Sequence, residues 1–266
     1  VTLGTLICAV LALTTSSATA QDDFNRPAPP DDVTSLGSNI QRTMTLLATS
    51  TPEKRNHVRV LFYGQSVTRN PWWQDVAEHL RTSYPHADLE IENRAIGGYT
   101  APVLINTAEF DLYPYYPDLL IFHVYGGVEG GEQEKIIEKV RRTTTSEILL
   151  WTSHFRWPGD LPRDGDPDDP AARKLTEADE TRTAMIRNSA ERYGCELAEV
   201  RERMRAYLKD NDLFPKDTLN DSVHPNKLGN FLIGELIKPS LRHDPRFSRD
   251  RWQDMVRDVP VDDPSV

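Results

Sequence analysis

The chain has 266 residues, of which 31 are Lys or Arg and 41 are Asp or Glu, so its formal net charge is −10 with neutral histidines. Hydrophobic residues make up 38% of the chain, which is typical of a globular protein and too many for wholesale disorder. The acidic balance disfavours nucleic-acid binding, and two cysteines exclude both a disulfide scaffold and a cysteine-based zinc site.

Residues 1–20 contain no charged side chain, and their apolar run is shorter than the ~20 residues that a membrane span needs. The run fits the hydrophobic region of a secretory signal, and Ala18-Thr19-Ala20 matches a cleavage site. We therefore expect a signal peptide over 1–20 and a secreted or periplasmic mature chain that no longer associates with a membrane. A buried core helix is the alternative interpretation of this segment.

The rest of the chain divides into a leader, one domain and a tail. Residues 21–55 are rich in Asp, Pro, Ser and Thr, which predicts a surface or disordered leader, and 241–266 form a charged tail. Between them, residues 56–240 alternate between short apolar runs and segments with helical periodicity. Strands are predicted over 57–64, 88–96, 117–126, 147–153 and 195–200, and helices over 72–84, 131–143, 171–193 and 226–237.

Strands that alternate with helices indicate βαβ crossovers. The predicted fold is a three-layer α/β/α sandwich with a central five-stranded parallel sheet. An acidic, Pro-rich insert (158–170) separates the fourth strand from its helix and is either a lid or a plain surface loop.

In parallel sheets, ligands bind beyond the carboxyl ends of the strands. The first strand ends in Gly64-Gln65-Ser66, which would expose Ser66 at that edge as a candidate nucleophile. Taken alone, this serine is better explained as a helix N-cap or a turn residue than as a nucleophile.

A base for this serine is found before the last helix. Asp221 and His224 lie three residues apart on a predicted turn, so the carboxylate can accept from one imidazole nitrogen and leave the other for the nucleophile. The alternative is a capping arrangement in which Asp221 and Asn226 only satisfy backbone donors.

Together, Gly-x-Ser-x-Thr after the first strand and Asp-x-x-His-Pro-Asn before the last helix resemble the SGNH (GDSL) hydrolase superfamily, over about residues 57–237. The resemblance implies a flavodoxin-like sandwich and a Ser66, His224, Asp221 triad. The family's first block is typically Gly-Asp-Ser, whereas Gln65 stands here in place of the Asp.

The family's other two blocks supply the oxyanion hole. The segment from Asn93 to Thr100 is similar to the second block, which implies that the backbone N–H groups of Gly98 and Ser66 hold the oxyanion; a plain strand-exit turn is the alternative. The third block normally contributes an Asn side chain after the third strand. This chain has no Asn there, and His123 or Tyr125 is the candidate replacement, with a core role as the other interpretation of His123.

Aromatic and arginine side chains near these blocks suggest a carbohydrate substrate. Trp72, Trp73, Arg94 and Trp157 are the predicted binding residues, with Arg69 and Arg156 near them, because rings stack on sugars and guanidinium groups bind hydroxyls or carboxylates. Core positions are the alternative for these tryptophans.

We therefore expect a secreted serine esterase that removes O-acetyl groups from carbohydrate, without a metal or organic cofactor. The substrate is expected to be a polysaccharide or a small molecule. Because the base must be neutral, activity should rise as the imidazole loses its proton, near pH 6–7 for an ordinary histidine. The alternatives are an enzyme that acts on another glycan bond and a noncatalytic carbohydrate-binding module. The sequence leaves the oligomeric state open.

Overall fold

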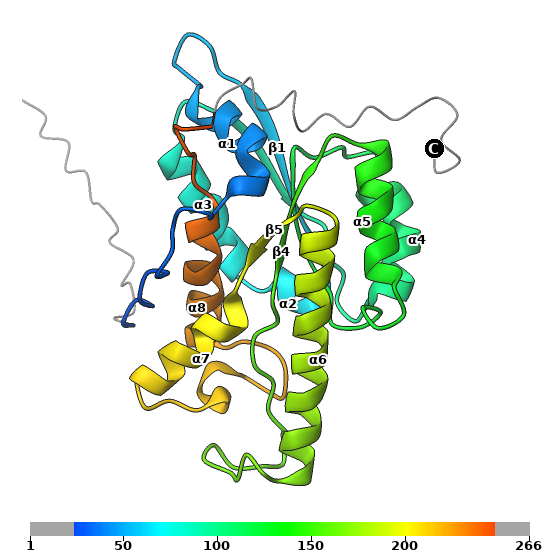
Figure 1. Ribbon diagram of the computed structural model, residues 1–266, viewed down its shortest axis with the longest axis vertical. Helices are drawn as coiled ribbons and strands as arrows, with labels where there is room; N and C mark the ends of the chain where they lie inside the picture. The colour runs from blue at the N-terminus through cyan, green and yellow to red at the C-terminus, as the bar shows by residue number, and fades with distance from the viewer. Residues whose placement is uncertain (1–23, 248–266) are drawn as a thin grey trace, which may run out of the picture.

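The computed structural model describes residues 24–247, so the predicted signal peptide and the last part of the predicted tail lie outside the described residues. The centre of the molecule is a sheet of parallel strands (Figure 1). The strand order is β2-β1-β3-β4-β5. Every one of these strands overlaps a predicted strand, which confirms the five-stranded parallel sheet. Their bounds are β1 (His57–Gly64), β2 (Asp88–Asn93), β3 (Leu119–His123), β4 (Glu147–Trp151) and β5 (Glu196–Ala198).

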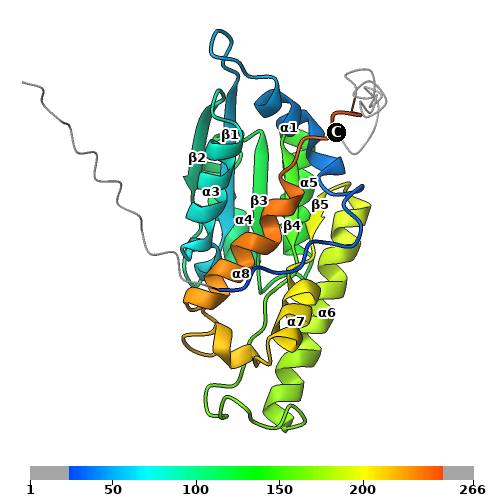
Figure 2. The same ribbon diagram turned by 90° about the vertical axis from the view of Figure 1, so that its left-hand side faces the viewer.

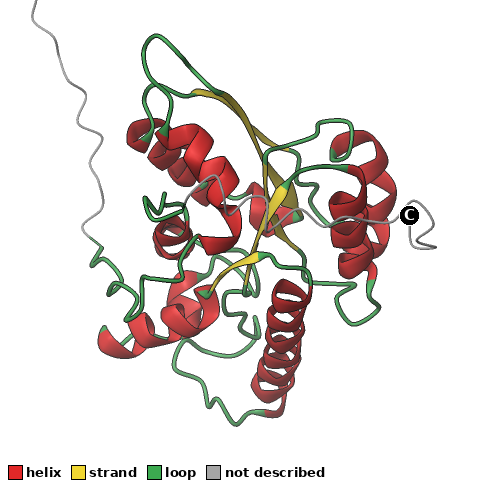
Figure 3. Cartoon of the chain, turned by 45° about the horizontal axis from the view of Figure 1, so that its top comes forward, coloured by secondary structure: helices red, strands yellow, loops and turns green. Residues whose placement is uncertain are grey.

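Helices cover both faces of this sheet, as Figure 3 shows. The helices α1, α3, α7 and α8 share a hydrophobic core with one face, whereas α4, α5 and α6 share a second core with the other. The predicted three-layer sandwich is therefore confirmed. The α-helices are α1 (Gln41–Ala48), α2 (Ser66–Arg69), α3 (Trp72–Ser83), α4 (Ala101–Asp111), α5 (Glu132–Thr143), α6 (Pro170–Arg192), α7 (Val200–Asp210) and α8 (Lys227–Ile237). Short 3-10 helices in the described part of the chain are η1 (Ser38–Ile40), η2 (Pro215–Thr218) and η3 (Lys238–Ser240).

The burial of each strand depends on its place in the sheet. β3 and β4 lie inside it and are buried at every position, because helices cover both of their faces. β2 lies at an edge and is only partly buried. The regular parallel register brings the carboxyl ends of β1 and β3 to the same edge, where Gly64 pairs with His123.

The predicted leader is not a surface arm throughout. Residues 38–48 form η1 and α1, and Ile40, Met44 and Leu47 are buried in the core on one face of the sheet. Two buried carboxylates hold this segment: Glu147 accepts from the backbone N–H groups of residues 42 and 43, and Glu196 from those of residues 37 and 39. The composition of the leader predicted an exposed arm, but residues 37–48 are fixed on the sheet by contacts with Glu147 and Glu196, which lie far away in the sequence.

Three further α-helices of the described residues were not predicted: the four-residue α2, α4 and α7. α4 carries apolar residues all around its axis, so it lacks the one-sided periodicity that marks a surface helix. α7 begins at Val200, inside the segment predicted as the last strand, because β5 already ends at Ala198.

The insert 158–170 packs against η2. Lys216 donates to the carbonyl groups of Gly159 and Leu161, and Arg163 pairs with Asp217. Figure 2 shows α6 extending past the end of the sheet, with the insert at its far end. Within residues 24–247, no helix combines the length and the apolar character that crossing a bilayer would require.

Candidate active site

The serine is held at the edge of the sheet by a sharp turn. Gly64, the last residue of β1, has φ +151°, and a Cβ atom on it would lie 2.3 Å from the carbonyl oxygen of His123. Only glycine therefore fits between the ends of β1 and β3. Two residues later, Ser66 is the first residue of α2, and the N-cap position belongs to Gln65, whose side chain makes no capping hydrogen bond. The structure thus removes the capping interpretation of Ser66.

Residues 219–225 form a closed loop, called the acid–base loop below, that carries Asp221 and His224. Leu219 and Pro225 form a bridge, and the backbone N–H of Asn220 donates to the carbonyl of His224 over 2.8 Å. Asp221 Oδ1 accepts from the backbone N–H of His224 at 2.7 Å. Asn226 caps α8 by accepting from the N–H of Gly229, so the capping alternative holds for Asn226.

The structure brings the three predicted catalytic side chains together. His224 Nε2 lies 3.0 Å from Ser66 Oγ, and His224 Nδ1 lies 2.8 Å from Asp221 Oδ2. The carboxylate can only accept, so the N–H is at Nδ1 and the lone pair at Nε2 faces the hydroxyl. This is the arrangement in which an imidazole takes a proton from a serine.

Asp221 stays ionised in this arrangement. Its partial burial raises the pKa, but the hydrogen bonds from the backbone of His224 and Val223 and from the His224 ring lower it further, so the pKa of Asp221 falls to about 2. The residue therefore carries its negative charge at neutral pH and keeps the imidazole in the productive tautomer.

The glycine pair of the second block lies beside the serine. A Cβ atom on Gly97 would be 3.9 Å from Ser66 Cβ, and the N–H of Ile96 donates to the carbonyl of Gly64 at 2.9 Å. Gly98 follows with φ +78°, and a Cβ atom on it would meet no other atom within 4 Å. This placement is compatible with Gly98 as an oxyanion donor, which stays a prediction.

The two candidate replacements for the third donor are occupied elsewhere. His123 is fully buried, stacks on Trp151 at 3.9 Å between ring centroids, and pairs through Nε2 with Ser153 Oγ at 2.9 Å. The hydroxyl of Tyr125 pairs with His154. Both rings are buried, and Nε2 of His123 and the hydroxyl of Tyr125 already have partners. The expectation that one of them completes the oxyanion hole is therefore corrected, and the core interpretation of His123 holds.

The predicted sugar-binding residues are also mostly elsewhere. Trp72 is fully buried and donates to the Val67 carbonyl, and Trp157 is 6% exposed and donates to the Pro162 carbonyl, so neither ring can stack on a ligand. Trp73 is partly buried against Phe62.

Of the three arginines considered, two are held by other side chains. Arg94 pairs with Glu92 and lies over the Tyr115 ring, and Arg156 binds the buried Asp179. Arg69 is exposed, and its Nη1 atom would be 3.6 Å from a Cβ on Gly97. It lies three residues after Ser66 on α2, and this helical spacing is the signal that could have assigned it to the site.

A groove of about 490 Å³ flanks the acid–base loop. It lies between the starts of α3 and α8. Its lining consists of asparagines, phenylalanines, prolines and two charged residues, Asp75 and Lys227. Within residues 24–247, no cluster of His, Cys, Asp or Glu is arranged to bind a metal ion.

Comparison with known proteins supports the fold. No family model matches the sequence, and no curated protein matches it. Among solved structures, a protein of Parabacteroides merdae assigned as a GDSL-like lipase is 18% identical, with a TM-score of 0.59 over 69% of this chain and 95% of that chain. The acetylxylan esterase Axe2 of Geobacillus stearothermophilus is 18% identical, with a TM-score of 0.56 over 72% of this chain and 97% of that chain.

A third structural neighbour is LAE5, an alpha/beta hydrolase enzyme from the metagenome of Lake Arreo in Spain. It is 20% identical, with a TM-score of 0.55 over 69% of this chain and 94% of that chain. Three further Axe2 structures are of catalytic mutants, in which a serine, an aspartate or a histidine is replaced by alanine. In Axe2, this aspartate and this histidine are three residues apart. The chain therefore has the SGNH hydrolase fold.

Proposed function

We propose that this protein is a serine esterase in which Ser66, His224 and Asp221 form the catalytic triad. The observation that carries the proposal is the continuous chain of contacts from Ser66 Oγ through His224 to Asp221, at 3.0 and 2.8 Å. The same residue types, with the same three-residue spacing between aspartate and histidine, are the subjects of the Axe2 catalytic mutants.

The reaction follows from this geometry. Ser66 Oγ attacks the ester carbonyl carbon while its proton moves to His224 Nε2, and the carbonyl oxygen becomes an oxyanion held by the N–H groups of Ser66 and Gly98. When the carbon–oxygen ester bond breaks, His224 returns the proton to the leaving alcohol. Water then attacks the acyl-serine with His224 again as the base, which releases the acid and restores Ser66.

For the substrate, we propose O-acetyl groups on carbohydrate, hydrolysed after export through the predicted signal peptide. Support comes from the fold neighbour named an acetylxylan esterase and from the asparagines of the groove beside the acid–base loop. Asn70 and Asn220 each donate to one backbone carbonyl, which leaves one N–H and the side-chain oxygen of each to match sugar hydroxyls. The stacking of sugar rings on Trp72 and Trp157 that the sequence predicted plays no part in this proposal, because both rings are buried.

The decisive experiment is covalent labelling with an alkyl phosphonate ester, followed by mass spectrometry of the labelled peptide. We expect label on Ser66 in the unmodified protein and none in Ser66→Ala. In His224→Gln, we expect labelling to slow strongly, because the hydroxyl loses its base. Label at another residue, or none at all, would overturn the esterase; absent labelling together with glycan binding would establish a noncatalytic module instead.

The substrate class is tested by acetate release from acetylated xylan and from p-nitrophenyl esters of increasing chain length. We expect the acetyl esters to be the best substrates. A preference for long acyl chains would refute the carbohydrate proposal while leaving the triad intact.

A further inference from the structure

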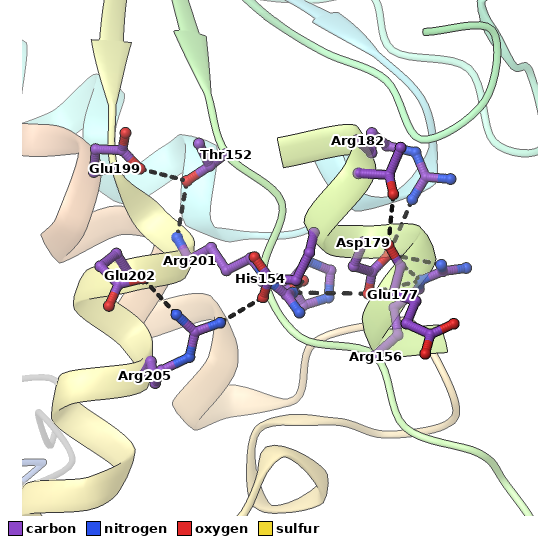
Figure 4. A network of polar contacts seen from close by, with 12 residues as sticks. Thr152, His154, Arg156, Glu177, Asp179, Arg182, Glu199, Arg201, Glu202 and Arg205 are labelled. Carbon is purple, nitrogen blue, oxygen red and sulfur yellow. Dashed lines mark hydrogen bonds and ion pairs between the residues drawn. The ribbon is translucent and has the colours of Figure 1, made fainter. Parts of the chain in front are cut away.

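A buried histidine lies behind the acid–base loop and has no role in the chemistry above. His154 follows β4 and is fully buried, and its Nε2 atom lies 2.7 Å from the carbonyl oxygen of Val223. On the other side of the ring, Nδ1 contacts the hydroxyl of Tyr125. Figure 4 shows His154 between Arg201 of α7 and Asp179 of α6, within a network of charged side chains.

The direction of both hydrogen bonds is determined by their partners. Burial lowers the pKa of His154 to about 4, so the ring is neutral near pH 7 and carries one N–H. A carbonyl oxygen only accepts, so this N–H is at Nε2 and points to Val223. Nδ1 then accepts from the hydroxyl of Tyr125, whose pKa is raised by burial, which keeps the proton on the phenol.

The carbonyl that His154 holds belongs to the peptide unit between Val223 and His224. The N–H of the same unit donates to Asp221 Oδ1 at 2.7 Å, and Asp221 Oδ2 in turn contacts the His224 ring. A donor on the carbonyl side fixes the plane of the peptide and strengthens its N–H as a donor, because hydrogen bonds in a chain polarise one another. The orientation of the aspartate is thus coupled to His154.

The other end of this chain reaches the nucleophile. The backbone N–H of Tyr125 donates to Gln65 Oε1 at 3.3 Å, and Gln65 directly precedes Ser66. His154 is itself held by Arg201, whose Nη1 donates to its carbonyl oxygen at 3.2 Å. A line of contacts therefore runs from Gln65, next to Ser66, through the buried Tyr125 and His154 to the acid–base loop.

We propose that His154 is a positioning residue: its Nε2–H holds the Val223–His224 peptide so that Asp221 and His224 stay aligned with Ser66. The inference rests on the proposed esterase function. It assigns a role to a residue that touches neither the substrate nor the reacting atoms.

The test compares two substitutions at this position. His154→Phe keeps the ring volume and removes both hydrogen bonds, whereas His154→Gln keeps a donor near the Nε2 position. For His154→Phe, we expect kcat on an acetyl ester to fall about 10- to 100-fold with little change in KM, since a small misplacement of catalytic groups has an effect of this size. His154→Gln should recover most of kcat.

A spectroscopic readout separates positioning from general destabilisation. The proton that His224 Nδ1 shares with Asp221 should give a low-field proton NMR signal in the unmodified protein and in His154→Gln, and this signal should shift or disappear in His154→Phe. Gln41→Leu is the matched control. Gln41 is also buried and donates to a backbone carbonyl, that of Gly37, but it lies in α1, away from the triad.

We expect Gln41→Leu to lower the melting temperature while kcat and the low-field signal stay unchanged. If His154→Phe keeps both kcat and the signal, the positioning role is refuted. If His154→Phe does not fold, Tyr125→Phe makes the same test, because it removes the hydroxyl that fixes the ring. The two proposals can fail separately. If the unmodified protein does not label at Ser66, the esterase proposal is wrong. The NMR signal still tests how His154 aligns Asp221 and His224, because it requires no turnover.

Discussion

His224 Nε2 lies 3.0 Å from Ser66 Oγ although 158 residues separate the two in the chain. The serine is held by the glycine turn at the end of β1, and the histidine by the closed loop before α8. Two locally rigid segments thus meet at one edge of the sheet, and the proposed chemistry depends on both.

The first prediction concerns the orientation of the base. Asp221→Asn should lower kcat about 10³- to 10⁴-fold, because an amide in place of the carboxylate no longer holds the productive imidazole tautomer. Initial rates on p-nitrophenyl acetate measure the effect. Asp32→Asn is the matched control, since Asp32 likewise accepts from a nearby backbone N–H in an exposed turn. A loss below tenfold in Asp221→Asn would contradict the role of this carboxylate.

Two glycines near the serine should respond differently to alanine. In Gly64→Ala the new methyl group would lie 2.3 Å from the His123 carbonyl oxygen, so we expect a loss of about 3 kcal/mol or more in the free energy of unfolding. In Gly98→Ala the space is open and only the φ of +78° is unfavourable, which costs about 1 kcal/mol.

Activity distinguishes Gly98 from an ordinary turn glycine. Gly98→Ala should lower kcat more than its loss of stability explains, because the backbone donor moves. Gly194→Ala is the control: Gly194 has φ +59° and open space, and it precedes β5 at the opposite end of the sheet. Equal kcat in the two variants would remove Gly98 from the oxyanion hole.

Arg69 is predicted to bind the substrate. Its exposed guanidinium lies beside Gly97, so Arg69→Ala should raise KM for acetylated glycans severalfold and change kcat for p-nitrophenyl acetate little. Arg81→Ala, at an exposed position in the last turn of α3, is the control. A fall in kcat for both kinds of ester would instead place Arg69 at the oxyanion.

The buried Asp179 is predicted to be essential for stability. Its side chain is 1% exposed and accepts from Arg156 and Arg182 at 2.6 and 2.9 Å, with Arg201 at 3.7 Å (Figure 4). Asp179→Ala would leave these guanidinium groups without their shared partner, so we expect a loss of about 3–5 kcal/mol. Urea unfolding measures it. The control, Asp244→Ala, breaks an exposed pair and should leave the unfolding midpoint unchanged.

A pH dependence is predicted for the attachment of α1. Burial raises the pKa of Glu147 and of Glu196 above the ordinary glutamate value of 4.5, despite the backbone hydrogen bonds that each accepts. A carboxyl whose pKa is raised by folding contributes stability below pH 4.5 and loses that contribution as the pH rises through the folded-state value.

Glu147→Gln and Glu196→Gln should therefore each reduce the fall in unfolding free energy between about pH 4 and pH 7, relative to the unmodified protein. Glu53→Gln, at an exposed position outside any helix or strand, is the control. Parallel pH profiles for all four proteins would show that these carboxyls do not titrate with folding.

Much of the fold could be predicted because its signals are local. The apolar runs that became β1, β3 and β4 and the one-sided periodicity of α5 reflect burial of neighbouring positions along the chain. α4 escaped prediction because its apolar residues surround the axis, and α1 because its packing on the sheet depends on Glu147, about a hundred residues away.

The sequence by itself determined the alternation of strands and helices and the two motifs that hold Ser66, Asp221 and His224, since turn chemistry and hydrophobic periodicity act over a few residues. Only the tertiary structure decided the roles of the other side chains: it buried Trp72, took His123 out of the oxyanion hole and left Arg69 beside Gly97. The reason is physical, because whether a ring or a guanidinium faces ligand or core depends on which distant segments pack against it.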